Sequence, residues 1–332
     1  DCLTRTGGDS GNRTTFTFSA WIKRSNLCNG GTNQSIFGGG SSSTNRDVLR
    51  FSGDDELEYQ NVIGGVSLSV KTTALFRDVT AWMHIVLRVD TTQADSANRV
   101  KIYINGVQQT LTGNTTNWHA QNSVTFFTHS TLRVLGARTN DGSSKNLFFD
   151  GYMAEVHLID GTSLAPTSFA TDFYKTWAPK EYNTSDGGYG AVGFHLDFAD
   201  GAAIGDDNSG QTHDWTVQNL SATDVVIDSP TNNFATINAL TMGQNNTISN
   251  GALKTASMWS ADLSGAHMTQ FLQSGKWYWE IRPGGAGSVY PYLGIGTWAS
   301  TTKAATYGSR YTIALGANGT AVEAYTQMGT IT

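Results

Sequence analysis

The sequence has 332 residues, of which 39% are hydrophobic and 11% aromatic, enough to form the cores of two domains of ordinary size. Only 14% of the residues are charged, the formal net charge is −6 at pH 7 and no basic run occurs, so we expect no nucleic-acid partner. No stretch of about 18 apolar residues is present, so we expect no membrane insertion.

The first residues, DCLTRTGG, are typical of the middle of a domain, and we expect the numbered chain to be a piece of a longer protein. Cys2 and Cys28 have no CxxC or histidine neighbours, so the sequence indicates no metal site there. It leaves open whether the two cysteines pair, with free thiols as the default.

Strand patterns dominate the first half of the chain. In residues 16–22 the even positions (Phe, Phe, Ala, Ile) share one face, and Thr, Ser and Trp share the other. Further strands are predicted at residues 83–89, 100–104, 132–136 and 152–159, with a short helical turn within 166–174. Asn105-Gly106 predicts a type I′ hairpin whose return strand contains Val107 and Leu111. This spacing predicts an all-β fold built of antiparallel β-sandwiches.

Local composition and strand patterning divide the chain into three segments. Residues 1–170 carry the strands described above, and residues 171–236 are rich in turns, which predicts an ordered irregular connector with short strands. Residues 237–332 form a second strand-rich unit, with strands expected at 276–282, 292–296, 311–315 and 321–325. This unit ends without an obvious closing strand, so we expect it to be incomplete.

Four motifs in this order, FTFSAWIKRS, WMHIVLRVD, NRVKIYINGVQ and FFDGYMAEVHLIDGTSL, resemble a laminin-G-like jelly roll of the concanavalin A-like lectin/glucanase superfamily. Later, GALKTASMW, SGKWYWEIRPGG and PYLGIG resemble the opening of a SPRY-type sandwich. The tandem, joined by GFHLDFAD and DSPTNNFATINAL, is similar to structural proteins of tailed bacteriophages, especially marine ones. That resemblance implies a tail fibre or another virion appendage.

The stretch GKWYWEIRPG has three consecutive aromatic residues. In a strand over 276–282, Trp277, Trp279 and Ile281 share one face, while Tyr278 lies on the other. A face of two tryptophans and an isoleucine is typical of a core, so we expect burial. The alternative, a stacking platform for sugars, rests mainly on Tyr278.

We expect no catalytic residues. Enzymes of this superfamily use an E-x-D-x-E strand, because alternate carboxylates share a face at the ~5–5.5 Å separation that retention requires. The nearest cluster, residues 54–58 (DDELE), has Glu56 and Glu58 on one face but no third carboxylate, and we interpret it as a solvated hairpin tip. The histidines show no repeated metal spacing.

Calcium is the one candidate cofactor, because jelly rolls of the resembled superfamily often hold Ca²⁺ at loop carboxylates. Three loops offer such oxygens: residues 140–142 with a downstream aspartate, residues 90–95 and residues 200–208, of which the last is favoured. The alternative is that these residues only form turns. The candidate ligands are Asp141, Asp150, Asp200, Asp206, Asp207 and Asn208.

Aromatic residues in polar loops, outside any alternating pattern, are the candidates for glycan contact. They are Trp118, His119, Tyr189 and Trp298. An exposed Trp among Asn and Thr suits sugar stacking with hydrogen bonds, and it equally suits packing beneath the loop or against a neighbouring subunit.

We therefore expect a non-enzymatic virion appendage protein, exposed on the particle surface, that adheres to a host-surface glycan or receptor. Its expected partners are other virion proteins and further copies of itself, with a trimer as the expected oligomer, because weak contacts gain strength from multivalency. One alternative is a structural spacer or a capsid or tail cement protein without a ligand. Lower alternatives are an extracellular adhesion protein and a glycan hydrolase.

Overall fold

The computed structural model describes residues 1–270 apart from residues 9, 29–30, 115–117, 243–245 and 258–266. Tertiary contacts divide the chain into two compact units, Asp1–Phe234 and Ala235–Thr332. The expected all-β fold with antiparallel sheets is confirmed. Within the described residues, no helix is long and apolar enough to cross a membrane.

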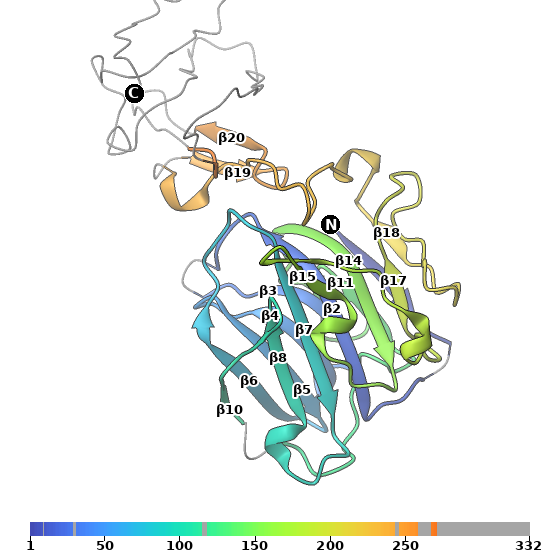
Figure 1. Cartoon of the computed structure of the whole chain (residues 1–332). Helices are drawn as coiled ribbons and strands as arrows, with labels where there is room; N and C mark the ends of the chain where they lie inside the picture. Colours follow the sequence, from blue (N-terminus) through green and yellow to red (C-terminus); the bar gives the residue numbers. More distant parts are fainter. Residues whose placement is uncertain (9, 29–30, 115–117, 243–245, 258–266, 271–332) are drawn as a thin grey trace, which may run out of the picture. The chain divides into compact units, whose positions relative to one another are not determined.

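The first unit is a sandwich of two antiparallel sheets that lie face to face (Figure 1). The larger sheet has eight strands in the order β10-β6-β5-β4-β3-β11-β1-β18. Its strands are β1 (Cys2–Thr6), β3 (Gln34–Ser42), β4 (Asn45–Phe51), β5 (Glu56–Ile63), β6 (Val66–Leu75), β10 (Leu111–Gly113), β11 (Leu132–Leu135) and β18 (Thr216–Gln218). The smaller sheet has six strands in the order β17-β14-β2-β7-β8-β9. Its strands are β2 (Thr15–Arg24), β7 (Met83–Asp90), β8 (Val100–Ile104), β9 (Val107–Gln108), β14 (Gly151–Asp160) and β17 (Phe194–Leu196).

Minor elements decorate this sandwich. Two short hairpins are formed by β12 (Arg138–Thr139) with β13 (Lys145–Asn146), and by β15 (Ala170–Phe173) with β16 (Thr176–Pro179). Single 3₁₀ turns are η1 (Ser96–Asn98), η2 (Pro166–Ser168), η3 (Thr184–Asp186) and η4 (Ala222–Asp224). The helical turn expected within 166–174 is therefore limited to η2, because the chain extends again at Ala170.

Strand β2 shows how alternation in the sequence builds the core. Its even-numbered residues from Phe16 to Ile22 are fully buried between the two sheets, as the period of two predicts. Phe18 stacks on Phe37 of β3 in the opposite sheet, with ring centroids 5.0 Å apart. Such inter-sheet ring contacts add to the burial of apolar area that drives the sandwich together.

The outer face of the six-stranded sheet is buried as well, which the sequence pattern did not indicate. Trp21 packs with Trp82 and Ala170, and His84 is fully buried. The His84 ring bonds Ser19 Oγ at 2.8 Å and accepts a hydrogen bond from Trp177 Nε1 at 3.0 Å. The segment after β14 therefore covers this face of the sheet.

Residues 171–236 were expected to form a separate connector, but all of them up to Phe234 belong to the same compact unit as the jelly roll. The expected short strands are present, but β17 pairs with β14 and β18 pairs with β1, so each extends one sheet of the sandwich. The buried Lys23 side chain donates hydrogen bonds to Asp228, Asn233 and the Phe234 carbonyl, each at 2.7 Å. Strand pairing and these bonds integrate the segment into the sandwich.

Both cysteines are free thiols buried in separate clusters of the sandwich. Burial raises the pKa of the Cys2 thiol and of the Cys28 thiol, so both stay protonated at neutral pH.

The described part of the second unit is small. It contains the 3₁₀ turn η5 (Ala239–Thr241) and a hairpin of β19 (Asn246–Ser249) and β20 (Lys254–Ser257). Ile237 forms an isolated antiparallel bridge with Met268. The strands expected at 276–282, 292–296, 311–315 and 321–325, including the aromatic stretch GKWYWEIRPG, lie outside the described residues. The SPRY-type resemblance therefore stays a prediction.

Candidate functional site

A pocket of 290 Å³ lies where the edge strands of the two sheets approach each other. The eight-stranded sheet contributes Val70 of β6 and Leu111 of β10. The six-stranded sheet contributes Val100 of β8 and Gln108 of β9, and the turn η1 closes one side. The two sheets are not hydrogen-bonded to each other at this edge, and the space between them is the pocket.

One wall of the pocket is the segment that passes from β9 in the six-stranded sheet to β10 in the eight-stranded sheet. Asn105 and Gly106 have φ values of +48° and +80°, which confirms the expected type I′ turn between β8 and β9. After β9, however, Leu111 does not continue the return strand. It pairs with Thr72 of β6 in the opposite sheet, because the chain crosses over at Gln109 and Thr110. The prediction for Leu111 is therefore wrong.

Trp118 lies at the apolar side of the pocket rather than in an exposed loop. Its side chain is only 6% exposed, and its ring stacks on Tyr59 with centroids 5.6 Å apart. The sequence left open whether Trp118 is exposed or packs beneath its loop, and in the structure the loop folds Trp118 into the core cluster. Its indole N–H is a hydrogen-bond donor and has no acceptor function.

The rest of the lining is mostly polar but carries few charges. Asn114 accepts a hydrogen bond from Ser69 N–H through Oδ1 at 2.9 Å, and its Nδ2 donates to no described residue. Gln108 Oε1 accepts from the Tyr103 hydroxyl at 3.1 Å. These bonds fix two amide groups at the pocket, where each keeps unused hydrogen-bonding capacity. The polar lining residues are Ser96, Lys101, Gln108, Gln109, Thr110 and Asn114.

The other aromatic candidates do not gather at this pocket. His119 is half-buried beside Trp118, and its Nε2 lies 3.4 Å from the Asn61 carbonyl oxygen. Tyr189 is 4% exposed, and it packs in a separate cluster with its hydroxyl 3.1 Å from His157 Nδ1. The segment that covers the six-stranded sheet buries Tyr189, and a role of Tyr189 in glycan contact stays a prediction. Trp298 lies outside the described residues.

The candidate calcium ligands of the loop at residues 200–208 act as turn-forming residues. Asp207 Oδ1 accepts from the backbone N–H groups of His195 and Ser209, and its Oδ2 accepts from Ser209 Oγ and the His213 N–H. Asp200 caps its own turn at the Ala202 N–H. Asp206 and Asn208 are exposed at the surface of the loop.

The remaining calcium candidates lie in the loop before β14. Asp141 caps the N–H groups of Ser143 and Ser144, and Asp150 is partly buried, which raises the pKa of its carboxyl. Neither loop brings three candidate carboxylates together among the described residues. Calcium binding stays a prediction.

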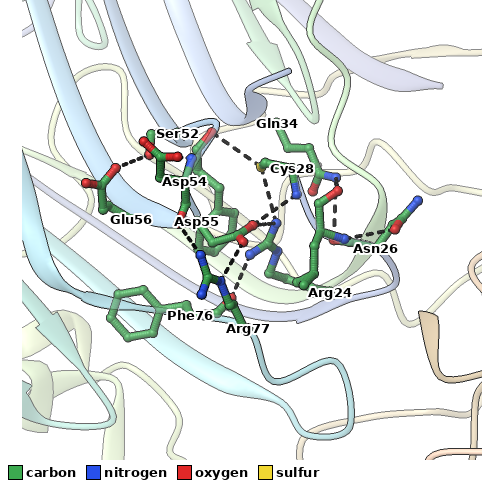
Figure 2. Close-up of polar contacts among 12 residues, drawn as sticks. Arg24, Asn26, Cys28, Gln34, Ser52, Asp54, Asp55, Glu56, Phe76 and Arg77 are labelled. Carbon is green, nitrogen blue, oxygen red and sulfur yellow. Dashed lines mark hydrogen bonds and ion pairs between the residues drawn. The ribbon is translucent and has the colours of Figure 1, made fainter. Parts of the chain in front are cut away.

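The acidic residues 54–58 form ion pairs and no carboxylate pair of the catalytic kind. Glu58 pairs with Arg50 at 2.9 Å and is buried, and Glu56 pairs with Lys71 at 3.4 Å. Figure 2 shows Asp55 between Arg24 and Arg77, with the loop of Cys28 beside it. The interpretation as a solvated hairpin tip is wrong for Asp55 and Glu58, because both carboxylates neutralise arginines inside the fold.

The sequence reasoning missed the amides of the pocket and the two buried cations of β2. Gln108, Gln109 and Asn114 lie in an unpatterned polar stretch, and only the sheet crossing brings them beside Trp118. Lys23 and Arg24 are the last two residues of β2, and a pair of cations at the end of a strand is usually exposed. No local signal reports that both are fully buried.

The first unit is an antiparallel, two-layer jelly roll of the concanavalin A-like class. Residues 4–166 match the family described as the concanavalin A-like lectin/glucanases superfamily, which agrees with the laminin-G-like resemblance of the same segment. No curated protein sequence matches the chain significantly.

Solved structures with a similar fold include a SAP-like pentraxin from Limulus polyphemus, with 16% identity and a TM-score of 0.35 over 49% of this chain and 71% of that chain. The CBM40 of the Ruminococcus gnavus IT-sialidase, bound to α2,3-sialyllactose, has 12% identity and a TM-score of 0.34 over 46% of this chain and 79% of that chain. The NanB sialidase from Streptococcus pneumoniae has 13% identity and a TM-score of 0.35 over 50% of this chain. The match spans only 29% of the sialidase chain.

Proposed function

We propose that the first unit is a non-enzymatic glycan-binding module and that the pocket between β6, β8, β9 and β10 is its binding site. The observation that carries the proposal is that one pocket combines the Trp118 indole with several amide and hydroxyl side chains. The match of residues 4–166 to a superfamily that includes lectins supports it.

The chemistry of the pocket suits a sugar. A pyranose has an apolar C–H face and several hydroxyls, each of which both donates and accepts hydrogen bonds. Carboxamides such as those of Gln108 and Asn114 also offer both donors and acceptors, so they match vicinal hydroxyls without a net charge. The volume of 290 Å³ lies near the lower limit of small-molecule sites, roughly 300 Å³, so we propose a short glycan end as the ligand.

A glycan array with the purified chain, run with calcium and with a chelator, identifies the sugar. For the sugar that binds, we expect Gln108→Ala and Trp118→Phe each to weaken affinity by about tenfold, because each removes one or two hydrogen bonds worth about 1 kcal/mol each. Trp118→Phe keeps a ring on Tyr59 and removes only the larger indole with its Nε1–H. Affinity is measured by isothermal titration calorimetry.

Gln211→Ala is the matched control, because Gln211 is an exposed glutamine that does not line the pocket. It should bind like the unchanged protein, and all variants should keep their melting temperatures within a few degrees. Unchanged affinity in both pocket variants would remove the pocket as the site. A blank array with folded protein would instead favour a structural spacer without a ligand.

We further propose that this module works as part of a virion appendage, such as a tail fibre of a tailed bacteriophage, in several copies. The domain series resembles such proteins, and one shallow glycan site gains useful strength only when several copies bind at once. An exposed hairpin tip at Phe173 and Tyr174, 62% and 89% exposed, offers an apolar surface for contact between subunits.

Native mass measurement tests the assembly. We expect a mass at a multiple of 35.7 kDa, with three copies as the leading expectation. Tyr174→Asp should shift the distribution toward the single chain, since it puts a charge into the proposed contact. A clean monomer at all concentrations tested would contradict the proposal for this chain.

A further inference from the structure

A second cluster of functional groups lies at the other edge of the six-stranded sheet, away from the pocket. Strands β17 and β14 form that edge, while β9 forms the edge at the pocket. Glu155 and His157 of β14 and His195 of β17 hold their ligand-type atoms within 4.8 Å of one another. Among the residues that the structure describes, no other group of three or more His, Cys, Asp or Glu side chains does this.

Strand pairing builds this cluster. His157 and His195 are direct partners in the β14–β17 ladder, so their rings stand side by side on the outer face of the sheet, with centroids 4.1 Å apart. A β-bulge between Ala154 and His157 inserts Glu155 beside them. Glu155 adopts a φ of +48°, a costly conformation for a residue other than glycine, and β-bulges recur where a side chain is re-aimed.

The ligand atoms of the three side chains converge. Glu155 Oε2 lies 2.9 Å from His195 Nε2 and 3.7 Å from His157 Nε2. A metal ion with bonds of about 2.0–2.2 Å to nitrogen and carboxylate oxygen needs ligand atoms roughly 3.3 Å apart in a tetrahedral arrangement. The two rings are nearly parallel, with 11° between their planes, so metal binding requires the rings to turn until both Nε2 lone pairs point at one position next to Oε2.

The surroundings orient the ligands as they do in metal sites. His157 Nδ1 lies 3.1 Å from the Tyr189 hydroxyl, a bond that leaves Nε2 facing Glu155. The backbone N–H of His195 donates to Asp207 at 2.8 Å, which fixes the start of the loop after β17.

The site is also open to solvent on one side. The His157 side chain is 3% exposed, but that of His195 is 18% exposed and that of Glu155 38% exposed. An ion can therefore enter past Glu155, and a water molecule can complete the coordination from the same direction.

We propose that Glu155, His157 and His195 bind a divalent transition-metal ion of the zinc class, with water as the fourth ligand. Two imidazoles and one carboxylate are the donor set that suits Zn²⁺, whereas Ca²⁺ and Mg²⁺ prefer oxygen ligands alone. The ion would clip the edge strand β17, and with it the segment that follows, onto β14. It would act as a structural staple of the sandwich.

The test compares thermal unfolding of the metal-stripped protein with and without ZnCl₂, together with calorimetric titration of Zn²⁺. We expect Zn²⁺ at about 100-fold excess over its Kd to raise the melting temperature by roughly 5 °C or more. Glu155→Gln and His195→Gln should each weaken Zn²⁺ binding at least about tenfold and remove most of this shift. His129→Gln, a histidine outside the cluster, is the matched control and should keep both.

Three outcomes would overturn the proposal: no Zn²⁺-dependent shift in the unchanged protein, unchanged binding in Glu155→Gln and His195→Gln, or an equal shift with Mg²⁺. Folding of the variants is checked without metal. If one variant fails to fold, the Co²⁺ spectrum of the unchanged protein decides, since tetrahedral coordination by nitrogen and oxygen gives intense visible bands. Their absence at saturating Co²⁺ would also count against the site.

Discussion

The Asp55→Ala variant is expected to lose about 3–5 kcal/mol of unfolding free energy, because it leaves a buried guanidinium without its counter-ion. The Arg24 side chain is 0% exposed, and its Nη2 donates to Asp55 Oδ1 at 2.9 Å. Arg24 lies on the inner face of β2, with its guanidinium over the Phe51 ring at 4.1 Å. Because the Arg24 side chain is fully buried, its guanidinium is left with a charge that no other carboxylate in the described residues neutralises.

Asp55 has a second task that adds to this effect. Its Oδ1 also accepts the backbone N–H of Cys28 at 2.9 Å, and its Oδ2 accepts from Arg77 at 3.1 Å (Figure 2). One carboxylate thus fixes three chain segments at one end of the sandwich. Asp55 also has a φ of +71°, which Ala tolerates less well than Asp or Asn.

Asp55→Asn separates the charge from the backbone conformation, and it should lose less than Asp55→Ala. Asp54→Ala is the matched control, because Asp54 is the exposed neighbour in the same turn, and it should change stability by less than about 0.5 kcal/mol. Urea unfolding measures all three. Equal losses for Asp54→Ala and Asp55→Ala would show that the turn, and not the ion pair, carries the effect.

Acid provides an independent check of the same ion pair. Burial alone would raise the pKa of Asp55, but the hydrogen bonds from Cys28, Arg77 and Arg24 together outweigh it and leave the pKa below its ordinary value. A carboxyl with a lowered folded-state pKa stabilises the protein above its unfolded pKa, about 3.9, and loses this contribution as pH falls through the folded pKa. The stability gap between the unchanged protein and Asp55→Asn should therefore narrow below about pH 4.

The features that the sequence predicts correctly are local ones. The inward face of β2 follows from alternation within seven residues, and the β8–β9 turn follows from the Asn105-Gly106 pair alone. Each depends on backbone preferences and a period of two, which neighbouring residues encode without knowledge of the rest of the chain.

The features that the sequence hides depend on distant segments. Trp21, Ser19 and His84 look like a half-polar outer face, but the segment containing Trp177 covers them. Trp118 has no alternation around it, so its burial against Tyr59 depends on how a loop returns between the sheets.

The candidate sites are also assembled from residues that are far apart in the sequence. The pocket amides meet Trp118 only because the chain changes sheets between Gln108 and Leu111. His157 and His195 become neighbours only through pairing with β17, a three-residue strand that is too short for a periodic signal. Propensity cannot report such placement, because it is set by pairing and burial across the whole sandwich.

Loss of the Asp228 carboxylate is expected to have an effect as large as that of Asp55. Asp228→Ala should lower the unfolding free energy by about 3–5 kcal/mol, because Lys23 Nζ lies 2.7 Å from Asp228 Oδ2 and the Lys23 side chain is 0% exposed. Asp228 Oδ1 also accepts a hydrogen bond from Trp82 Nε1 at 2.7 Å. Removal of the carboxylate therefore leaves the buried Lys23 ammonium without its counter-ion and the Trp82 indole N–H without its acceptor.

The place of this ion pair predicts a second, local consequence. Lys23 extends from the outer face of β2 and holds residues 228–234 through Asp228, Asn233 and the Phe234 carbonyl. In Asp228→Ala this segment should open far below the global unfolding energy, which hydrogen exchange followed by mass spectrometry measures as faster exchange in residues 225–234. The strands of the jelly roll core should keep their protection.

Lys23→Met distinguishes the charge from the contact, since Met fills a similar volume without a charge. Lys23→Met alone leaves the Asp228 carboxylate without its cation. The double variant Lys23→Met with Asp228→Asn removes both charges, and its loss of unfolding free energy should be clearly smaller than the sum of the losses in the two single variants. Asp172→Ala, an exposed aspartate of β15, is the control for loss of a surface carboxylate. Strict additivity of the two changes at positions 23 and 228 would contradict an energetically coupled pair. The tethering of residues 228–234 would then rest on the backbone carbonyl of Phe234 and the amide of Asn233 instead.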